Sequence, residues 1–145
     1  MIEIAVVDRP TSEIADAVSQ LLPQLSSGAA QVDESSLRSI VASPATRLFV
    51  ARDGPAIVGM LTLVLVRIPT GLRAYIEDVV VHDTHRRRGI GMALTQAALA
   101  AAEAAGARTV NLTSNAKRQA ANQLYEKMGF RRRDTNVFRL IFDRA

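Results

Sequence analysis

The sequence predicts an α/β (α+β) fold, in which a mixed, mostly antiparallel, twisted sheet of six to seven strands is flanked by about four helices. The middle of the chain carries three strand-like runs in succession, and the second half alternates strand-like with helical apolar spacing. A chain of 145 residues with 48% hydrophobic content can bury roughly 70% of its unfolded surface, which suffices for one core. We therefore expect a single domain over residues 1–145.

The first part of the chain predicts one strand and two helices. Residues 2–8 form a short apolar run that is typical of a strand, and residues 12–22 carry apolar side chains at helical spacing. Residues 33–41 predict a second short helix that ends before Pro44.

Three further runs predict a meander of antiparallel strands. Residues 48–51 and 56–66 flank Arg52-Asp53-Gly54-Pro55, a turn sequence in a hairpin setting. Residues 68–73 contain proline and glycine and predict a second turn, which leads into a β-branched run over 74–81.

The last third predicts two helices and two strands. Apolar residues at three- and four-residue spacing begin at Ile90 and stop at Gly106, a plausible helix C-cap. A strand over 110–113, a helix over 117–128 and a last strand over 136–142 follow. This alternation implies a parallel component in the sheet. The edge of the last strand offers a route to a homodimer.

Composition excludes several classes of protein. The chain has no cysteine, so a disulfide framework or a zinc-thiolate site is not available, and we expect no bound metal. The longest apolar run, residues 56–66, is too short to span a membrane. The N-terminus carries no basic leader, and we expect a cytoplasmic protein. The net charge of +4 comes mostly from arginine, and its compact clusters fit a small anion as well as a polynucleotide, so we expect no nucleic-acid partner.

The turn from Arg86 to Gly91 is the most informative stretch. It joins the strand ending at Val81 to the helix that begins near Ile90, and a helix N-terminus presents unpaired amides and a positive dipole to an anion. Gly89 and Gly91 would let a diphosphate approach the backbone, while the arginines would add charged donors. The alternatives are a plain turn with a solvated basic face, a dinucleotide fingerprint that lacks its third glycine at Leu94, and a P-loop without its Gly-Lys-Ser/Thr ending.

These residues resemble the acyl-CoA signature of the GNAT superfamily of N-acetyltransferases, Gln/Arg-x-x-Gly-x-Gly/Ala. Arg86, Gly89 and Gly91 fill that pattern. A second family motif, Leu-Tyr-x-Lys-x-Gly-Phe, is filled by residues 124–130. The order of elements along the chain also agrees with the GNAT fold.

The resemblance implies acetyl-CoA as co-substrate. Main-chain amides of the strand before the signature would hold the pantetheine arm, and the turn would hold the pyrophosphate. Many members carry an asparagine where this chain has Arg118, which leaves Asn115 or Asn122 to contact the cofactor. The cofactor-binding residues that we predict are Val79, Val80, Val81, Arg86, Arg87, Arg88, Gly89, Ile90, Gly91 and Asn122.

Acyl transfer to an amine also needs a base and an acid. Tyr125 matches the family's tyrosine, which protonates the departing thiolate; the alternative is an aromatic anchor of its helix. Glu77, in an otherwise apolar run, is the best base, and the alternative is a pairing with an arginine. The facing of its neighbour Asp78 depends on whether the strand is bulged. His82 and His85 are alternative bases, although their place in the turn predicts solvent exposure.

The predicted function is therefore the transfer of an acetyl group from acetyl-CoA to a primary amine, by direct attack in a ternary complex. The acceptor is a small molecule or a peptide that the sequence does not identify. The alternative is a catalytically silent CoA-binding sensor or interaction module.

Overall fold

The computed structural model describes residues 1–26 and 31–144. They fall into two compact units, Met1–Leu112 and Thr113–Ala145. The interpretation of residues 1–145 as a single domain stays a prediction.

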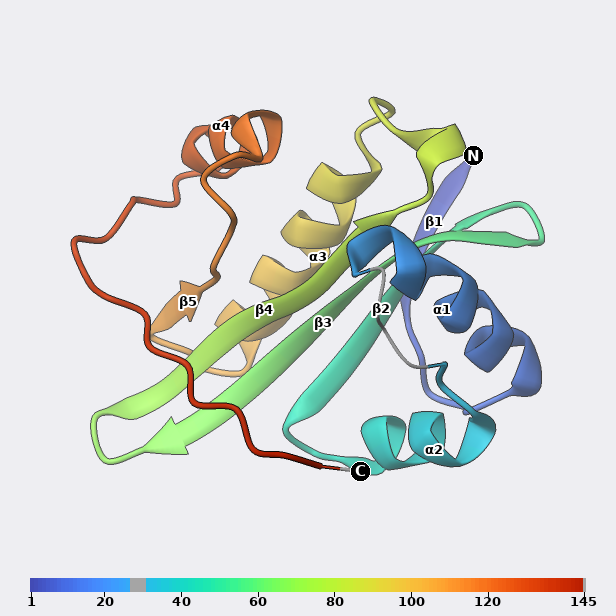
Figure 1. Cartoon of the computed structure of the whole chain (residues 1–145), viewed down its shortest axis with the longest axis horizontal. Helices are drawn as coiled ribbons and strands as arrows, with labels where there is room; N and C mark the ends of the chain where they lie inside the picture. The colour runs from blue at the N-terminus through green and yellow to red at the C-terminus, as the bar shows by residue number, and fades with distance from the viewer. Residues whose placement is uncertain (27–30, 145) are drawn as a thin grey trace. The chain divides into compact units, whose positions relative to one another are not determined.

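The first unit is built on one sheet of five strands in the order β1-β2-β3-β4-β5 (Figure 1). Neighbours from β1 to β4 pair antiparallel, and β4 pairs with β5 in parallel. The mixed, mostly antiparallel sheet is thus confirmed, with five strands where the sequence predicted six to seven. The strands are β1 (Ile2–Val6), β2 (Thr46–Asp53), β3 (Ala56–Ile68), β4 (Gly71–Val81) and β5 (Thr109–Asn111).

The predicted meander is present, and its two turns are tight. Only Gly54 and Pro55 separate β2 from β3, where Asp53 lies opposite Ala56. Residues 69 and 70 separate β3 from β4, so both strands are longer than their apolar runs. The short first loop places Asp53 at one end of the sheet.

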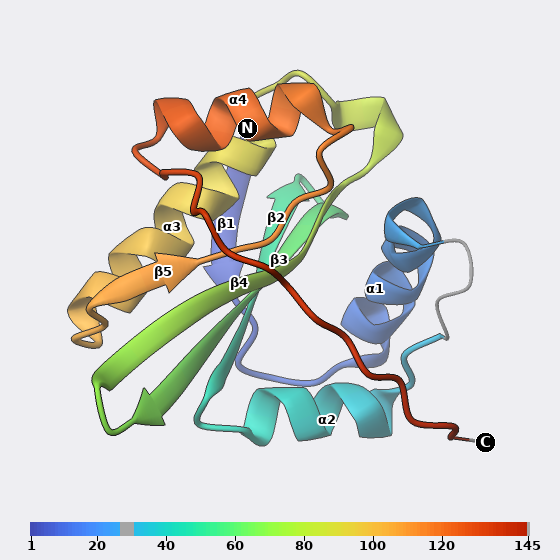
Figure 2. The same cartoon turned by 60° about the vertical axis from the view of Figure 1, so that its left-hand side comes forward.

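Helices cover both faces of this sheet, as Figure 2 shows. Side chains of α1 and α2 form one core cluster with Met60 of β3 and Val80 of β4. Because Gly59 and Met60 are adjacent on a strand, they face opposite sides, and Gly59 lies against Leu94 of α3. The helices are α1 (Ser12–Leu25), α2 (Glu34–Ala42) and α3 (Ile90–Ala104), and a short 3₁₀ turn, η1 (Asp83–His85), precedes α3.

Helix α3 follows its predicted pattern closely. Leu94, Ala98 and Ala102 recur every four residues and are all fully buried against the sheet. Gly106, with φ of 90°, follows the last turn and ends the helix, because the left-handed conformation at that position suits glycine. The crossover from β4 through α3 to β5 supplies the parallel pair that the sequence predicted.

The second unit contains helix α4 (Gln119–Lys127), within the predicted helix over 117–128. The predicted strand over 136–142 was wrong for this structure, because the described residues 131–144 contain no strand. A strand needs a hydrogen-bonded neighbour, and the described part of this unit contains no other strand. Val137, Phe138, Leu140, Ile141 and Phe142 are exposed.

The described residues contain neither a candidate membrane span nor a candidate metal site. No helix among residues 1–26 and 31–144 is both long and apolar enough to cross a membrane. In the same part of the chain, no three His, Asp or Glu side chains gather as a metal site would require.

Candidate active site

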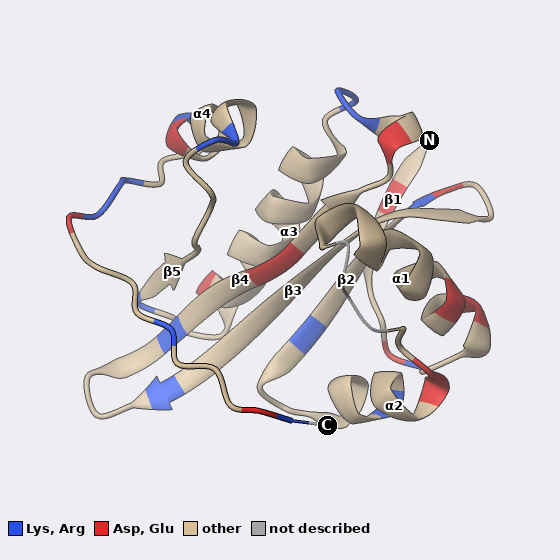
Figure 3. Ribbon diagram, in the orientation of Figure 1, with Lys and Arg blue, Asp and Glu red and all other residues tan. Residues whose placement is uncertain are grey.

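The loop between β4 and α3 carries three consecutive arginines, Arg86 to Arg88. Figure 3 shows it as blue next to the red of η1. Residues 86–89 are exposed, whereas Ile90 is buried and fixes the start of α3 against the sheet. The loop is also tied to α1, because the amide of Asp83 donates to the side-chain oxygen of Gln24 at 3.0 Å.

The N-terminus of α3 carries no side-chain cap. Helix α1 is capped by Thr11 and α2 by Asp33, whose side chains accept from backbone amides at 3.3 and 2.7 Å. At α3 the cap residue is Gly89, and the first helical hydrogen bond runs from the amide of Ala93 to the carbonyl of Gly89. The amides of residues 90–92 precede that bond, so they are free to bind an anion.

Two glycines keep the approach to these amides open. Gly89 has φ of 74°, a left-handed conformation that favours glycine, and a Cβ there would meet no atom within 4 Å. A Cβ on Gly91 would meet only the Val81 Cγ2 atom, at 3.9 Å. Among the described residues, therefore, no atom lies closer than an ordinary van der Waals contact to a Cβ at either position.

The three arginines of the turn are held differently. Arg86 pairs with Asp83 at 2.7 Å, and Arg88 lies 3.8 Å from Asp53. Arg87 makes no ion pair with residues 1–26 and 31–144, and its φ of 63° is left-handed, which is uncommon outside glycine. Such strained residues often occur where a turn binds a ligand.

Strand β4 is bulged just before the turn. Pairing shifts between Met60 and Thr62 of β3, and Asp78 on β4 has φ of 51°. The bulge that the sequence left open is therefore present. It places Glu77 and Val80 on one face, although they are three residues apart and a regular strand would separate them.

Beyond the bulge, residues 1–26 and 31–144 place no paired strand on the β5 side of β4, and we call this side the free edge of β4. Described pairing with β5 ends at Tyr75. The amide of His82 donates to the Val58 carbonyl of β3 at 2.8 Å. Because successive amides alternate, those of Val79 and Val81 point to the other edge. Their side chains are half-buried, while that of Val80 is buried in the core.

Glu77 is exposed and lies on the face that α1 and α2 cover elsewhere. It pairs with Thr62, which shares that face with Met60. The acidic residues of β4 are Glu77 and Asp78, and Figure 3 shows one red stretch on this strand. The carboxylate is therefore open to solvent, rather than enclosed by apolar side chains as its sequence neighbours suggested.

In the second unit, Tyr125 belongs to the C-terminal cap of α4. The amide of Phe130 donates to the Tyr125 carbonyl, and that of Gly129 donates to the Glu126 carbonyl, which is a Schellman motif. The Tyr125 and Phe130 rings meet edge to face at 5.7 Å. Burial raises the pKa of Tyr125, while the nearby Arg118 lowers it to a smaller extent, so the hydroxyl keeps its proton at neutral pH.

Comparison with known proteins identifies the family. A model of the acetyltransferase (GNAT) family matches residues 15–130. The chain belongs to the GNAT family. Comparison with curated proteins gives no match.

Solved structures share the fold of this chain. A transcriptional regulator from Bacillus halodurans C-125 superposes with a TM-score of 0.83 at 25% identity, covering 98% of this chain and 100% of that one. A putative acetyltransferase from Agrobacterium tumefaciens str. C58 gives 0.85 at 22% identity, with coverage of 97% and 99%. An aminoglycoside acetyltransferase from an uncultured soil metagenomic sample gives 0.86 at 19% identity, with coverage of 99% and 97%.

Each GNAT motif lies at the end of a helix in this chain. The signature residues 86–91 form the uncapped start of α3, directly after the free edge of β4. The second motif places Tyr125, Glu126, Gly129 and Phe130 at the four positions whose backbone groups form the Schellman motif. Asn122 donates from its side chain to the Asn115 carbonyl at 3.2 Å, so its predicted cofactor contact stays a prediction.

Sequence reasoning missed one residue that contacts the segment between β4 and α3. Asp53 is read from the sequence as a hairpin residue, yet its carboxylate lies 2.9 Å from the ring of His85. The histidine side chain is 18% exposed, against the solvent exposure that its turn position suggested. The two residues lie 32 positions apart in the chain, and only the fold brings them together.

Proposed function

We propose that this GNAT protein transfers an acetyl group from acetyl-CoA to a primary amine, by direct attack in a ternary complex. The observation that carries the proposal is the uncapped N-terminus of α3, which is open at Gly89 and Gly91 and flanked by Arg86 to Arg88. A plain turn would gain from a side-chain cap there, as α1 and α2 do. A diphosphate supplies the missing acceptors.

The residues present suit the pyrophosphate and the pantetheine arm of acetyl-CoA. Amides at the start of α3 and the arginine side chains would hold the pyrophosphate, and the free edge of β4 at Val79 and Val81 would hold the amide-bearing pantetheine arm. Acetyl-CoA supplies a thioester carbonyl that an amine can attack. A backbone amide of β4 would stabilise the oxygen of that carbonyl.

Two side chains would move the protons. Glu77 would accept a proton from the acceptor's ammonium group, directly or through water, and its exposed position makes it accessible to an incoming amine. Tyr125 would give its hydroxyl proton to the departing sulfur, and the raised pKa keeps that proton available at neutral pH. In the balance, a C–N bond forms and the C–S bond breaks, and the thiol leaves with the proton from Tyr125. The second proton of the attacking nitrogen would return through water to the Tyr125 oxygen, and Glu77 would release the first proton to solvent.

A calorimetric titration with acetyl-CoA tests the binding part of this proposal. Thiol release measured over a panel of amines then tests the chemistry, with a small polyamine, an aminoglycoside, a peptide N-terminus and a lysine peptide as acceptors. Tyr125→Phe keeps the ring contact with Phe130 and removes the proton donor, so kcat should fall about tenfold or more while thermal stability is kept. Binding without turnover on any acceptor would favour a CoA-binding sensor, and absence of binding would refute the proposal.

A further inference from the structure

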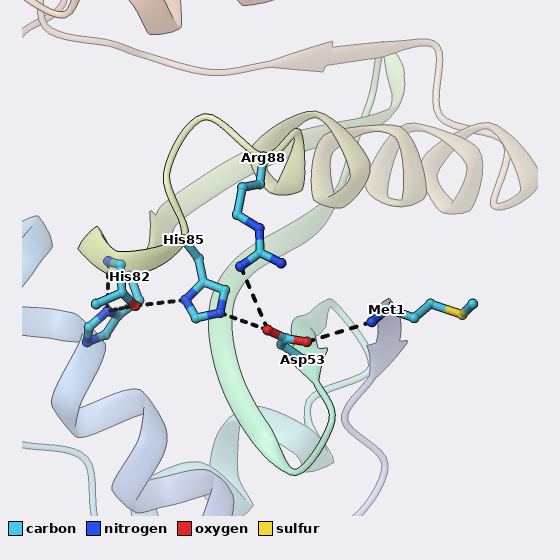
Figure 4. A network of polar contacts seen from close by, with 6 residues as sticks. Met1, Asp53, His82, His85 and Arg88 are labelled. Atoms are coloured by element: carbon cyan, nitrogen blue, oxygen red, sulfur yellow. Dashed lines mark hydrogen bonds and ion pairs between the residues drawn. The ribbon is translucent and has the colours of Figure 1, made fainter.

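The carboxylate of Asp53 joins the far end of the β2–β3 hairpin to the turn before α3. Figure 4 shows this network. The Oδ2 atom lies 2.9 Å from His85 Nε2 and 3.8 Å from the Arg88 guanidinium, and Oδ1 lies 3.8 Å from the amino group of Met1. Asp53 thus contacts His85 of η1, Arg88 of the turn and the amino group of Met1.

Thr84 continues the network on the other side of the His85 ring. Its hydroxyl oxygen lies 2.7 Å from His85 Nδ1 and 2.8 Å from His82 Nδ1. The Thr84 amide also donates to His82 Nδ1, at 3.2 Å. The chain of contacts therefore runs from His82 through Thr84 and His85 to Asp53 (Figure 4).

The Asp53 carboxylate fixes the direction of the central contact. Because an ionised carboxylate only accepts, His85 Nε2 donates to Asp53, and the charge on Asp53 makes this bond charge-assisted. At the other end of the chain, His82 Nδ1 accepts from the Thr84 amide. The Thr84 hydroxyl lies within hydrogen-bonding distance of His85 Nδ1, so both nitrogens of the His85 ring have a partner.

We propose that Asp53 is a positioning residue for the pyrophosphate turn, acting through His85. By fixing both nitrogens of that ring, Asp53 holds η1 in the conformation that leads into Arg86–Gly91, and it restrains the Arg88 side chain. The inference rests on the proposed function, because it assumes that this turn binds the pyrophosphate of CoA.

Charge alone predicts the opposite effect. Asp53 is ionised, since its hydrogen bond with His85 lowers its pKa, with smaller contributions from the N-terminus and Arg88. A carboxylate beside an anion site repels the anion, so removing it would strengthen CoA binding if charge dominated. A positioning role predicts weaker binding, and the sign of the change therefore separates the two.

The test compares Asp53→Asn with wild type by calorimetric titration of CoA and of pantetheine, which lacks the pyrophosphate. We expect Asp53→Asn to weaken CoA binding about tenfold, since a charge-assisted hydrogen bond is lost from the turn, and to leave pantetheine binding unchanged. Glu13→Gln is the matched control, because it removes the partner of the adjacent Arg52 in an ion pair at 3.0 Å and should leave both affinities unchanged. His85→Gln should lose as much CoA affinity as Asp53→Asn, and the double variant should lose no more CoA affinity than either single variant.

The outcomes separate this inference from the proposed function. If wild type and Glu13→Gln bind CoA, and Asp53→Asn binds it as tightly or more tightly, the positioning role is overturned while the proposed function stands. Equal loss of CoA and pantetheine binding also overturns it, because a general defect of the fold would act on both ligands. If wild type does not bind CoA, the proposed function itself fails. Should Asp53→Asn not fold, His85→Gln decides by the same comparison.

Discussion

The same substitution at two glycines should have opposite effects on stability. Neither Gly59 nor Gly91 has a left-handed φ, so alanine is compatible with both backbones. At Gly59 a Cβ would lie 3.2 Å from the Val80 carbonyl oxygen, 3.3 Å from Leu94 and 3.4 Å from Ile90. At Gly91 its nearest neighbour would be the Val81 side chain, at 3.9 Å.

These distances set the expected magnitudes. The Val80 carbonyl belongs to β4 and cannot yield without moving the strand, so Gly59→Ala should destabilise the protein by about 1–3 kcal/mol through overpacking. Gly91→Ala adds no close contact and restricts the unfolded chain, so it should stabilise by about 0.4–1 kcal/mol. At about 3 °C per kcal/mol for a chain of this size, Tm should fall by about 3–9 °C for the first and rise by about 1–3 °C for the second.

Thermal unfolding followed by circular dichroism, with urea unfolding as a second probe, measures both variants against wild type. The reasoning is refuted if Gly59→Ala is as stable as wild type, because the tight contacts between β3, β4 and α3 would then not exist. It is equally refuted if both variants shift Tm in the same direction by the same amount.

Three further predictions concern the helix ends. Thr11→Ala removes the acceptor for the Ile14 amide and should cost about 1 kcal/mol of stability in urea unfolding; an unchanged midpoint would contradict the cap. The hydrogen bond from the Ser36 amide lowers the pKa of Asp33 in the folded protein. The stability that the ionised Asp33 contributes is therefore complete above the unfolded carboxyl pKa of about 3.9, and it is lost as the pH falls through the lower pKa of the folded state. Asp33→Asn should flatten the plot of unfolding free energy against pH in this acidic range. A variant that keeps the wild-type slope there would contradict the role of Asp33. Gly129→Ala places a Cβ at φ of 102° and should cost about 1–2 kcal/mol, seen as faster amide exchange in α4; unaltered exchange would argue against the Schellman cap.

Local chemistry made the turn and the helix ends predictable from the sequence. Gly89 and Gly91 follow a β-branched run and precede an alanine-rich one, and this order fixes where α3 begins. Gly106 and Gly129 end α3 and α4, because each adopts a left-handed conformation just beyond its helix. Such features depend on neighbours within a few positions.

The features that were not predictable depend on distant residues. Whether β4 is bulged at Asp78 is decided by its register with β3. The Asp53–His85 contact requires the hairpin and the turn to meet, and neither residue type announces that pairing. The solvent exposure of Glu77 likewise follows from which part of the sheet face the helices leave open, not from its apolar neighbours in sequence.

Calorimetric titration of acetyl-CoA into wild type and Gly91→Glu tests most directly whether the start of α3 holds the pyrophosphate. A Cβ at Gly91 would meet only Val81 Cγ2, at 3.9 Å, so the backbone admits a side chain there, and the charge of a glutamate would repel the phosphates. Wild type and the Glu13→Gln control should bind acetyl-CoA, and Gly91→Glu should lose at least about tenfold in affinity without a drop in Tm. Binding by a folded Gly91→Glu protein as tight as that of wild type would contradict the account.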